Sequence, residues 1–480
     1  MRPRSKTASF LIASAAALAL STAARADLAN FGGFSPVNGT GGSYAGDGSS
    51  FTLTDNNGGE ASSGFNPTAQ NIGAFSASFT YTASGNAAAD GLAFILQNDS
   101  RGTTALGGGG GSLGYGFTNG TAGVAPSAAL ELNIFGSSGT QFVANGQTGG
   151  YLSTAPASLT SGPVNVSLNY NGSTVAISLT DSASNTFTKT YSNVSLPAIV
   201  GNGQALIGFS GGTGGATSTQ TVSNFAFQAV APTATPVYFK PINVSGFNQD
   251  LVVEKGAANP VLAVTGTMDN GPGATNGDTW YERGFNTSAT DTGLPAAGQI
   301  VSASDLSHLF KLSAYNGPNA FLLTPTGPGS TGTLTLGGTQ SYSTLSVLTS
   351  SGHGPDSIHL VVHHADGSTE TTASGSSPDW FNNNVAPAII ANGRVDPTNN
   401  LANSSSFDNV GSNDPRVFAV DFSLTDTTDP ITFVDVVQDG GGGDTAIFAL
   451  SGIESTPEPA SLGLMALGAL GLLARRRRQA

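Results

Sequence analysis

An acidic residue and a glycine stand directly before an unusually apolar run near residue 90, which reads Ala89-Asp90-Gly91-Leu92-Ala93-Phe94-Ile95-Leu96. A strand with one face in solvent alternates apolar and polar residues, whereas a strand buried on both faces is apolar throughout. The run therefore predicts a strand buried on both faces. It also predicts that the Asp90 carboxylate is held at the rim of a sheet, where it can accept hydrogen bonds from a ligand.

A second block, residues 129–135, predicts another buried strand, with an acid and an amide, Glu131 and Asn133, on alternate residues. Short alternating runs between Gly, Asn, Ser and Thr turns continue through the body of the chain. Glycine accounts for 66 of the 480 residues, and helical periodicity is nearly absent between the two ends. This pattern predicts an all-β protein.

Together the two blocks resemble the legume-type (L-type) lectins, in which an Asp-Gly-Leu-Ala-Phe strand and a Glu-x-Asp-x-aromatic strand flank the sugar pocket. Residues 207–214, IGFSGGTG, resemble the Val-Gly-Phe-Ser-Ala-Ala-Thr-Gly block of that family, and residues 51–79 resemble its opening strands. The resemblance covers nearly all of residues 27–228. It implies a concanavalin-like jelly-roll sandwich that binds carbohydrate.

The resemblance also implies a site. Asp90 matches the family aspartate that accepts hydrogen bonds from sugar hydroxyls, often after a cis Ala-Asp peptide. The glycine run 107–111, with Gly107 and Gly108 as candidates, lies where a second loop donates an amide; the alternative is a slack surface loop. Phe135 matches the aromatic residue that packs against the sugar ring, and the alternative is a core phenylalanine.

The metal site departs from the family pattern. The resemblance implies calcium and a transition metal, but Asn133 replaces an aspartate and Ser137 replaces an asparagine beside Glu131. Residues 136–142 contain no acid, and the first half contains no histidine. Calcium needs six to eight oxygen ligands, several of them carboxylates. We therefore expect a degraded metal site around Glu131 and Asn133, with calcium possible and no certain cofactor.

Residues 229–236, with two prolines among small residues, predict a linker between residues 27–228 and 237–455. The second half again reads as short strands and predicts a second β-sandwich, loosely similar to galactose-binding-like jelly rolls.

Three features of the second half are candidates for binding, each with a structural alternative. The five histidines are expected at surface polar positions: His308, His353, His359, His363 and His364. Trp280 and Trp380 are either sugar-stacking platforms or packing residues. Residues 439–444 form either a calcium loop or, as we expect, an acidic turn.

Both ends predict processing segments with helical character. Residues 1–26 have basic residues, an apolar run at 10–20 and an Ala24-Arg25-Ala26 cleavage site, typical of a signal peptide. At the other end, Pro457, Glu458 and Pro459 precede an apolar stretch, 460–474, and then four arginines: Arg475, Arg476, Arg477 and Arg478. This tail, 456–480, resembles the PEP-CTERM sorting signal of Gram-negative bacteria, which an exosortase cleaves after transient inner-membrane anchoring.

The net charge and the composition limit the classes of molecule that the protein can bind. Eight of the 16 basic residues and one of the 30 acidic residues lie in the two end segments, so the exported body has a net charge near −21. Such a body repels nucleic acid and anionic membranes. The chain contains no cysteine, so it has neither disulfides nor thiol chemistry.

The sequence therefore predicts an exported, non-enzymatic carbohydrate-binding protein of the cell surface or exopolysaccharide matrix. Glu131 has no second acid at the neighbouring alternate positions, as glycoside hydrolysis requires. The alternatives are a structural matrix protein with a degenerate lectin site and, third, a glycan-acting enzyme that works through its second domain.

Overall fold

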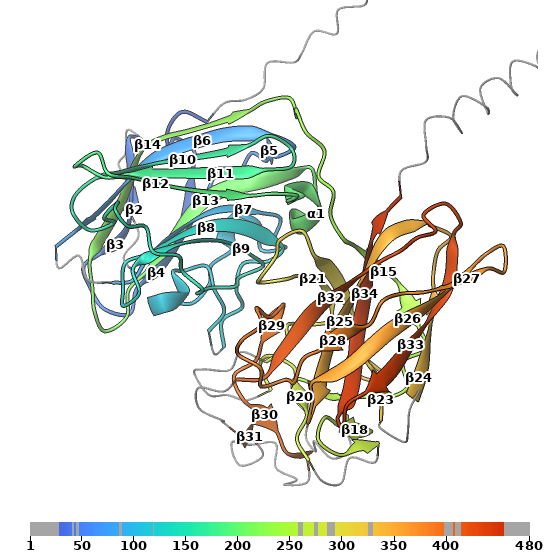
Figure 1. The fold of residues 1–480 in the computed structure, drawn as a ribbon. Coiled ribbons are helices and arrows are strands. Elements are labelled where there is room, and N and C mark those ends of the chain that lie inside the picture. Colours follow the sequence, from blue (N-terminus) through green and yellow to red (C-terminus); the bar gives the residue numbers. More distant parts are fainter. Residues whose placement is uncertain are drawn as a thin grey trace, which may run out of the picture.

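The computed structural model describes residues 28–40, 43–44, 48–85, 89–118, 120–257, 263–272, 277–285, 293–324, 330–397, 407–408 and 414–455. These residues form two β-sandwiches that lie side by side (Figure 1), which confirms the predicted all-β fold. The predicted helical segments 1–26 and 456–480 lie outside the described residues. In the ranges given above, no helix has the length and apolarity needed to span a membrane.

The first sandwich consists of two seven-stranded antiparallel sheets. The front sheet has the order β1-β4-β13-β7-β8-β9, with β5 beside β13: β1 Ser35–Thr40, β4 Ala61–Phe65, β13 Gln204–Gly212, β7 Gly91–Gln97, β8 Ser127–Asn133, β9 Gly139–Ala144 and β5 Gln70–Asn71. The back sheet has the order β12-β11-β10-β6-β14-β3-β2: β12 Thr186–Tyr191, β11 Val175–Thr180, β10 Val164–Tyr170, β6 Phe75–Ser84, β14 Thr219–Ala229, β3 Ser50–Asp55 and β2 Ser43–Tyr44. The connections between strands of the first sandwich contain three short helices: η1 Gly102–Thr104, η2 Gly110–Ser112 and α1 Leu196–Val200. This architecture confirms the predicted jelly-roll sandwich.

Strands β7 and β8 are buried along their whole length, as the apolar runs predict. Leu92, Phe94 and Leu96 face the core between the two sheets. Ala93 and Ile95 face outwards, but the loop between β7 and β8 folds over them with Ala105, Tyr115 and Val124. Since both faces are covered, both faces of these strands are apolar.

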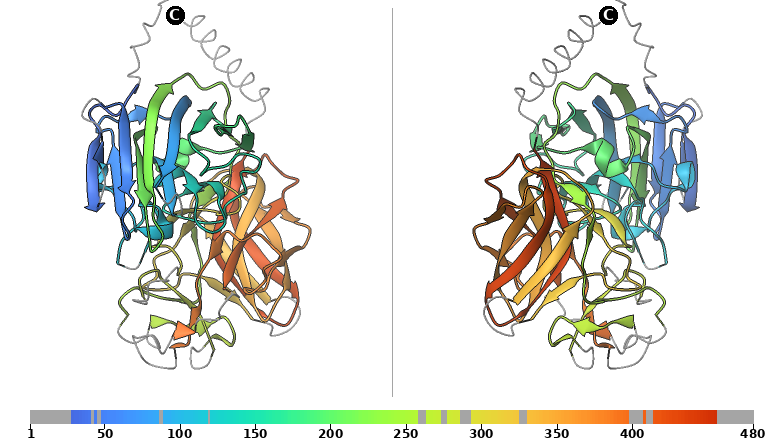
Figure 2. Two further views of the ribbon diagram at one scale, coloured as in Figure 1. Left: turned by 90° about the vertical axis from the view of Figure 1, so that its left-hand side faces the viewer. Right: turned by 90° about the vertical axis from the view of Figure 1, so that its right-hand side faces the viewer.

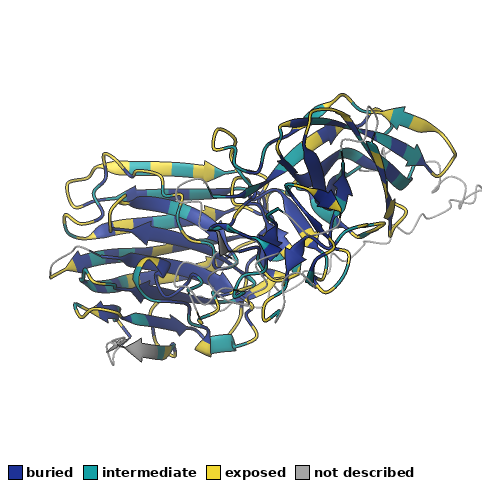
Figure 3. Ribbon diagram, turned by 90° about the horizontal axis from the view of Figure 1, so that it is seen from below, coloured by how far each residue is buried: buried dark blue, intermediate teal, exposed yellow. Residues whose placement is uncertain are grey.

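The back sheet has the opposite pattern, with one buried face and one solvent face. Phe79 contacts Phe94 and Phe209 of the front sheet, with ring centroids 5.7 and 5.0 Å apart. The outward side chains of β6, β10, β11, β12 and β14, here called the back-sheet face, are Ser76, Ser78, Thr80, Thr82, Ser84, Asn165, Ser167, Asn169, Ala176, Ser178, Thr180, Thr186, Thr188, Thr190, Thr219, Thr221, Ser223, Asn224, Ala226 and Gln228. Buried residues accordingly concentrate on the inner sides of the strands, and exposed residues lie on the outer strands and loops (Figure 3).

The second sandwich consists of two six-stranded sheets. One has the order β15-β34-β25-β32-β29, with β23 beside β34: β15 Lys240–Ile242, β34 Asp444–Glu454, β25 Tyr342–Gly352, β32 Arg416–Ser423, β29 Ile389–Ile390 and β23 Phe321–Leu323. The other has the order β16-β24-β33-β26-β27, with β28 beside β26: β16 Val244–Ser245, β24 Ser330–Leu336, β33 Ile431–Gly440, β26 Asp356–His364, β27 Thr369–Thr371 and β28 Gly375–Ser377. Short paired strands flank these sheets: β17 Val252–Val253 with β20 Trp280–Tyr281, β18 Gly266–Thr267 with β19 Gly271–Pro272, β21 Gly298–Val301 with β22 Leu309–Leu312, and β30 Arg394–Val395 with β31 Phe407–Asp408.

The two sandwiches contact each other beside β9 and α1 of the first, and the side views in Figure 2 show this junction from both directions. Leu306 and Leu309 of the second sandwich belong to the same buried apolar cluster as Phe142 of the first. Gln299 Nε2 donates a hydrogen bond of 2.8 Å to the Ala198 carbonyl across the junction. Strand β14 ends at Ala229 and β15 begins at Lys240, so residues 230–239 connect the two sandwiches, and the first residue of the predicted linker 229–236 belongs to β14.

Candidate functional site

Asp90 lies at the rim of the front sheet, immediately before β7. The Ala89-Asp90 peptide is cis. The Asp90 amide donates to the Gly212 carbonyl at 3.1 Å, and the Asp90 carbonyl accepts from the Ile134 amide at 2.8 Å. A Cβ on Gly91 would lie 2.0 Å from the Leu132 carbonyl oxygen, so only glycine fits there. The backbone of Asp90 is thus held between the loops that follow β13 and β8.

Two glycine backbones cover the Asp90 carboxylate. A Cβ on Gly214 would lie 3.4 Å from Asp90 Oδ2, and a Cβ on Gly110 would lie 3.9 Å from it. The Gly110 amide donates to the Thr213 carbonyl at 3.0 Å, which joins the two covering loops. Asp90 is only 5% exposed, and its Oδ2 is buried without a hydrogen-bond partner among the described residues. Burial raises the pKa of Asp90, and the nearby Gly214 amide, which makes no well-formed hydrogen bond to Oδ2, opposes that rise.

The candidate glycines Gly107 and Gly108 lie deeper in the same loop. Their amides donate to the carbonyls of Gly114 and Gly116 at 2.7 and 2.8 Å. These amides therefore hold the loop together, while Gly110 is the member of the glycine run that lies against Asp90.

Phe135 follows β8 and is 53% exposed, which excludes the alternative of a core phenylalanine. The neighbouring Ile134 amide bonds to the Asp90 carbonyl, so the backbone at Phe135 lies next to that of Asp90 at the rim. In the same loop, Asn133 Nδ2 donates to the carbonyls of Phe135 and Ser137 at 2.8 and 2.9 Å. One amide group thus closes the loop after β8.

The residues at the expected metal position do not fit calcium. A cation would accept lone pairs from carbonyl oxygens, and here the Asn133 amide donates hydrogen bonds to them instead. The carboxylate of Glu131 is fully buried and faces the Tyr151 hydroxyl and the Gly149 amide, but neither oxygen makes a well-formed hydrogen bond among the described residues. Burial raises the pKa of Glu131 well above its usual value. Across the part of the chain that the structure describes, no three His, Cys, Asp or Glu side chains are grouped to hold a metal.

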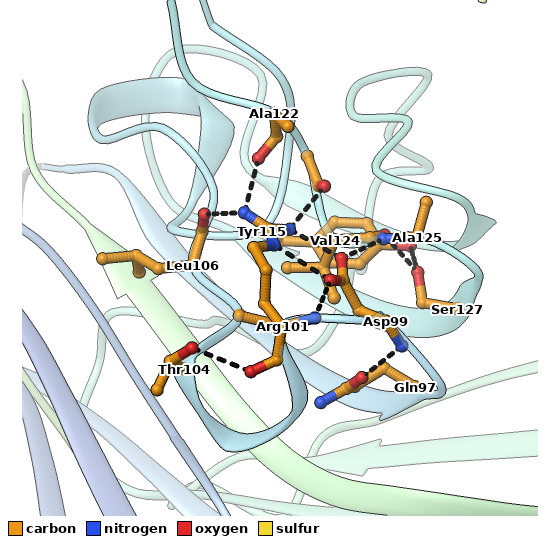
Figure 4. A network of polar contacts seen from close by, with 12 residues as sticks. Gln97, Asp99, Arg101, Thr104, Leu106, Tyr115, Ala122, Val124, Ala125 and Ser127 are labelled. Carbon is orange, nitrogen blue, oxygen red and sulfur yellow. Dashed lines mark hydrogen bonds and ion pairs between the residues drawn. The ribbon is translucent and has the colours of Figure 1, made fainter. Parts of the chain in front are cut away.

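An ion pair that sequence reasoning missed holds the loop over Asp90 (Figure 4). Arg101 binds both carboxylate oxygens of Asp99, at 2.9 and 2.6 Å. Its remaining N–H groups donate to the carbonyls of Leu106, Ala122 and Gly123 at 2.9, 3.3 and 2.8 Å. Burial raises the pKa of Asp99, but the hydrogen bonds from Arg101 outweigh burial and hold that pKa below its usual value. Only two basic residues occur in 27–228, and this scarcity could have identified Arg101.

The aromatic candidates of the second sandwich belong to its core. Trp280 and Trp380 are each 1% exposed and pack edge to face with ring centroids 5.5 Å apart. Neither offers a surface platform for a sugar.

The histidines of the second half are paired with acids more closely than the sequence suggests. His359 and His363 lie on β26 and bond to Asp439 and Asp435 at 2.6 and 2.9 Å. His308 and His364 are buried, in contrast to the expected surface positions. His308 stacks on Phe239 with ring centroids 4.0 Å apart and lies between Asp305 and Asp421, and His364 Nδ1 bonds to the Asp429 carbonyl at 3.1 Å.

Residues 439–444 form a tight turn. The Gly443 amide donates to the buried carboxylate of Asp356 at 3.2 Å. A Cβ on Gly441 would lie 1.8 Å from Asp356 Oδ1, so the turn closes directly over this acid.

Comparisons with solved structures find lectins. The lectin from Bauhinia forficata in complex with GalNAc is 18% identical, with 43% of this chain and 99% of that chain covered and a TM-score of 0.37. Arcelin-5, a lectin-like defense protein from Phaseolus vulgaris, is 18% identical, with 43% and 98% covered and a TM-score of 0.37. The exoplasmic/lumenal domain of VIP36, in a Ca2+/Man3GlcNAc-bound form, is 14% identical, with 44% and 90% covered and a TM-score of 0.34.

A search of the curated proteins finds no match for this chain. Residues 455–478 match the family model described as the PEP-CTERM protein-sorting motif. The match contains the predicted Pro-Glu-Pro triplet and the four arginines, and it confirms the predicted sorting signal. The chain therefore carries a PEP-CTERM motif and is an exported protein that is sorted to the cell surface.

Proposed function

We propose that this protein binds carbohydrate through the rim formed by Asp90 and Phe135. The observation that carries the proposal is the buried Asp90 carboxylate, whose Oδ2 has no partner among the described residues although the backbone around it is bonded on both sides. A buried polar atom without a partner costs free energy, and a ligand hydroxyl would satisfy it. The exposed Phe135 ring beside it can pack against the apolar face of a sugar.

The glycines above Asp90 give such a ligand access. Sugar hydroxyls reach Oδ2 when the backbones of Gly110 and Gly214 move apart, which breaks the hydrogen bond from the Gly110 amide to the Thr213 carbonyl. A carboxylate then accepts hydrogen bonds that are stronger than those between neutral groups.

Binding of this kind needs neither metal nor catalysis. The Asn133 amide closes the loop after β8, and the Asp99–Arg101 pair holds the loop over Asp90. Glu131 lies fully buried beneath the surface and has no second acid beside it on β8, so the rim lacks the pair of carboxylates that hydrolysis uses.

The sorting motif supports a role outside the cell. We propose delivery to the surface or exopolysaccharide matrix of a Gram-negative bacterium, after transient inner-membrane anchoring and cleavage by an exosortase. The acidic body disfavours nucleic acid as a partner.

A structural matrix protein with a closed site is the second candidate function. The observation that favours it is the cover that Gly110 and Gly214 form over the carboxylate. The two functions differ in whether the rim ever opens to a sugar.

A glycan array probed with the full chain tests the proposal, followed by titration of a short-glycan hit. Asp90→Ala should weaken binding at least about tenfold, because a charge-assisted hydrogen bond contributes roughly 1.5–3 kcal/mol. Asp439→Ala, an acid on the second sandwich, is the matched control and should bind like the wild type. Chelator should change little. Full binding by Asp90→Ala would contradict the site, and an array without any bound glycan would favour the structural alternative.

A further inference from the structure

The back-sheet face differs from the rest of the molecule in its chemistry. Every outward position on β6, β10, β11, β12 and β14 is Ser, Thr, Asn, Gln or Ala. The strand register aligns these side chains in rows across neighbouring strands. One row runs Thr188, Ser178, Ser167 and Ser78. The five strands lie side by side (Figure 1) and present a continuous surface of hydroxyls and amides.

An exposed sheet face of the second sandwich has a different side-chain composition. The outward positions of its β26 and β33 carry His359 and His363, which hydrogen-bond to the acids Asp439 and Asp435. That face of the second sandwich therefore includes carboxylates, whereas the back-sheet face has no charged side chain. Solubility alone does not require an uncharged face, because charged side chains solubilise a sheet face equally well.

A shallow groove of 330 Å³ crosses the back-sheet face. It is lined by Ser78, Thr80, Asn165, Ser167, Ser178 and Asn224, among others. A bulge in β14 between Ser223 and Ala226 puts Asn224 on the outer face, with a positive φ of 53°. Such bulges re-aim side chains at the surface of a sheet.

The polar groups in the groove are only partly used by each other. Asn224 Nδ2 donates to Thr80 Oγ1 at 3.2 Å, and Thr80 Oγ1 donates to Asn165 Oδ1 at 2.9 Å. These two hydrogen bonds leave the Asn165 amide nitrogen as a donor and the Asn224 amide oxygen as an acceptor. The hydroxyls of Ser78 and Ser167 enter no side-chain hydrogen bond with other described residues, and each can donate or accept.

We infer that the back-sheet face is a second binding surface, which takes a neutral polysaccharide chain lying across the strands. Mixed donors and acceptors without charge match a ligand whose own groups are uncharged hydroxyls. The net charge of the exported body, near −21, repels anionic polysaccharides from this face. The inference shares its ligand class with the proposed function, but it involves a different sheet and does not depend on Asp90.

The surface also predicts how the binding behaves. The face offers no ring on which a sugar can stack, so each sugar unit gains only weak polar contacts. Affinity then arises from many units that bind at once along one chain. Long polysaccharides should therefore bind, and short fragments of the same polysaccharide should compete poorly at equal sugar concentration.

Affinity electrophoresis of the full chain in mild detergent tests this inference, with hydroxyethylcellulose, laminarin or dextran in the gel and alginate as the anionic comparison. We expect at least one neutral polysaccharide, and not alginate, to retard the wild type. The pair Ser78→Val with Ser167→Val should weaken retardation by at least about tenfold in dissociation constant, the factor that corresponds to about 1.4 kcal/mol. The pair Ser78→Thr with Ser167→Thr has the same shape but keeps both hydroxyls, and it should be retarded like the wild type.

Thr335→Val, an exposed change on β24, is the control for a new apolar methyl group and should have no effect. Asp90→Ala should be retarded like the wild type, because the back-sheet face does not include Asp90. A failure of the proposed function would instead appear in the titration of the short glycan. The inference is wrong if no neutral polysaccharide retards the wild type, or if the valine and threonine pairs behave alike. It is equally wrong if Asp90→Ala abolishes retardation, or if the valine pair converts a sedimenting dimer into monomers, which would identify the face as an interface between copies.

Discussion

A single amide group occupies the place of a charge in the loop after β8. Asn133 Nδ2 donates to the carbonyl oxygens of both Phe135 and Ser137. A carboxylate at this position would need a cation to bridge it to the same oxygens. We therefore propose that the residue at 133 decides whether the rim depends on metal.

Asn133→Asp should destabilise the protein by roughly 1–3 kcal/mol, because two hydrogen bonds are replaced by repulsion between oxygens. Millimolar calcium should recover part of that loss in the variant and leave the wild type unchanged. Thermal unfolding with calcium and with chelator measures both effects. A wild type that calcium stabilises would show that the metal site uses other ligands.

Glu131 predicts a dependence of stability on pH. Burial raises its folded-state pKa above the usual 4.5, so the folded chain binds this proton more tightly than the unfolded chain. The contribution of Glu131 to the stability of the wild type therefore decreases as the pH rises above 4.5. Glu131→Gln should match the wild type at or below about pH 4.5 and be more stable by roughly 1–3 kcal/mol at about pH 8. Urea unfolding across pH measures the difference, and a variant that is less stable at high pH would contradict the sign.

At the scale of elements, the loop between β7 and β8 covers the outer face of the front sheet. Tyr115 and Val124 cover the outer face of β7, and the Asp99–Arg101 pair ties the ends of that loop together. The same loop carries Gly110 over Asp90. The ion pair therefore supports both the packing of the sheet and the placement of the rim.

Arg101→Lys should loosen the loop between β7 and β8, because lysine cannot bind both Asp99 oxygens and three carbonyls at once. We expect a loss of roughly 1.5–3 kcal/mol of unfolding free energy. Hydrogen exchange should rise selectively in residues 102–118. Lys189→Gln changes the other basic residue of the first sandwich and should leave exchange in this loop unchanged. Equal exchange in both variants would contradict the role of Arg101.

At the scale of the whole molecule, two sandwiches share apolar contacts and are followed by a sorting tail. Leu306 and Leu309 bury themselves against the first sandwich, and the motif match begins at residue 455, directly after β34. The body therefore ends in paired strand structure before the processing segment begins. Cleavage in the tail would leave both sandwiches intact.

The mature surface protein should lack the peptide that contains Arg475, Arg476, Arg477 and Arg478. Its apolar stretch is too short and too rich in Gly and Ala for a permanent anchor, so we expect it to be recognised and removed. Mass spectrometry of the surface fraction measures this directly. The same peptide in a strain without the exosortase is the control, and its recovery from the wild-type surface would contradict the sorting role.

The sequence by itself determined the all-β fold and the sorting tail, because both depend on local patterns of apolar, polar and charged residues. It also predicted the fully buried β7 and β8, since a strand that is apolar on both faces must be covered on both. The tertiary structure alone decided which side chains meet. Gly214 lies over Asp90, Arg101 reaches Gly123, and Trp280 packs into a core, because chain segments far apart in sequence converge there. Local patterning specifies which residues are buried, whereas contacts between distant segments depend on how the sheets pack, and a single sequence does not encode that packing in any local pattern.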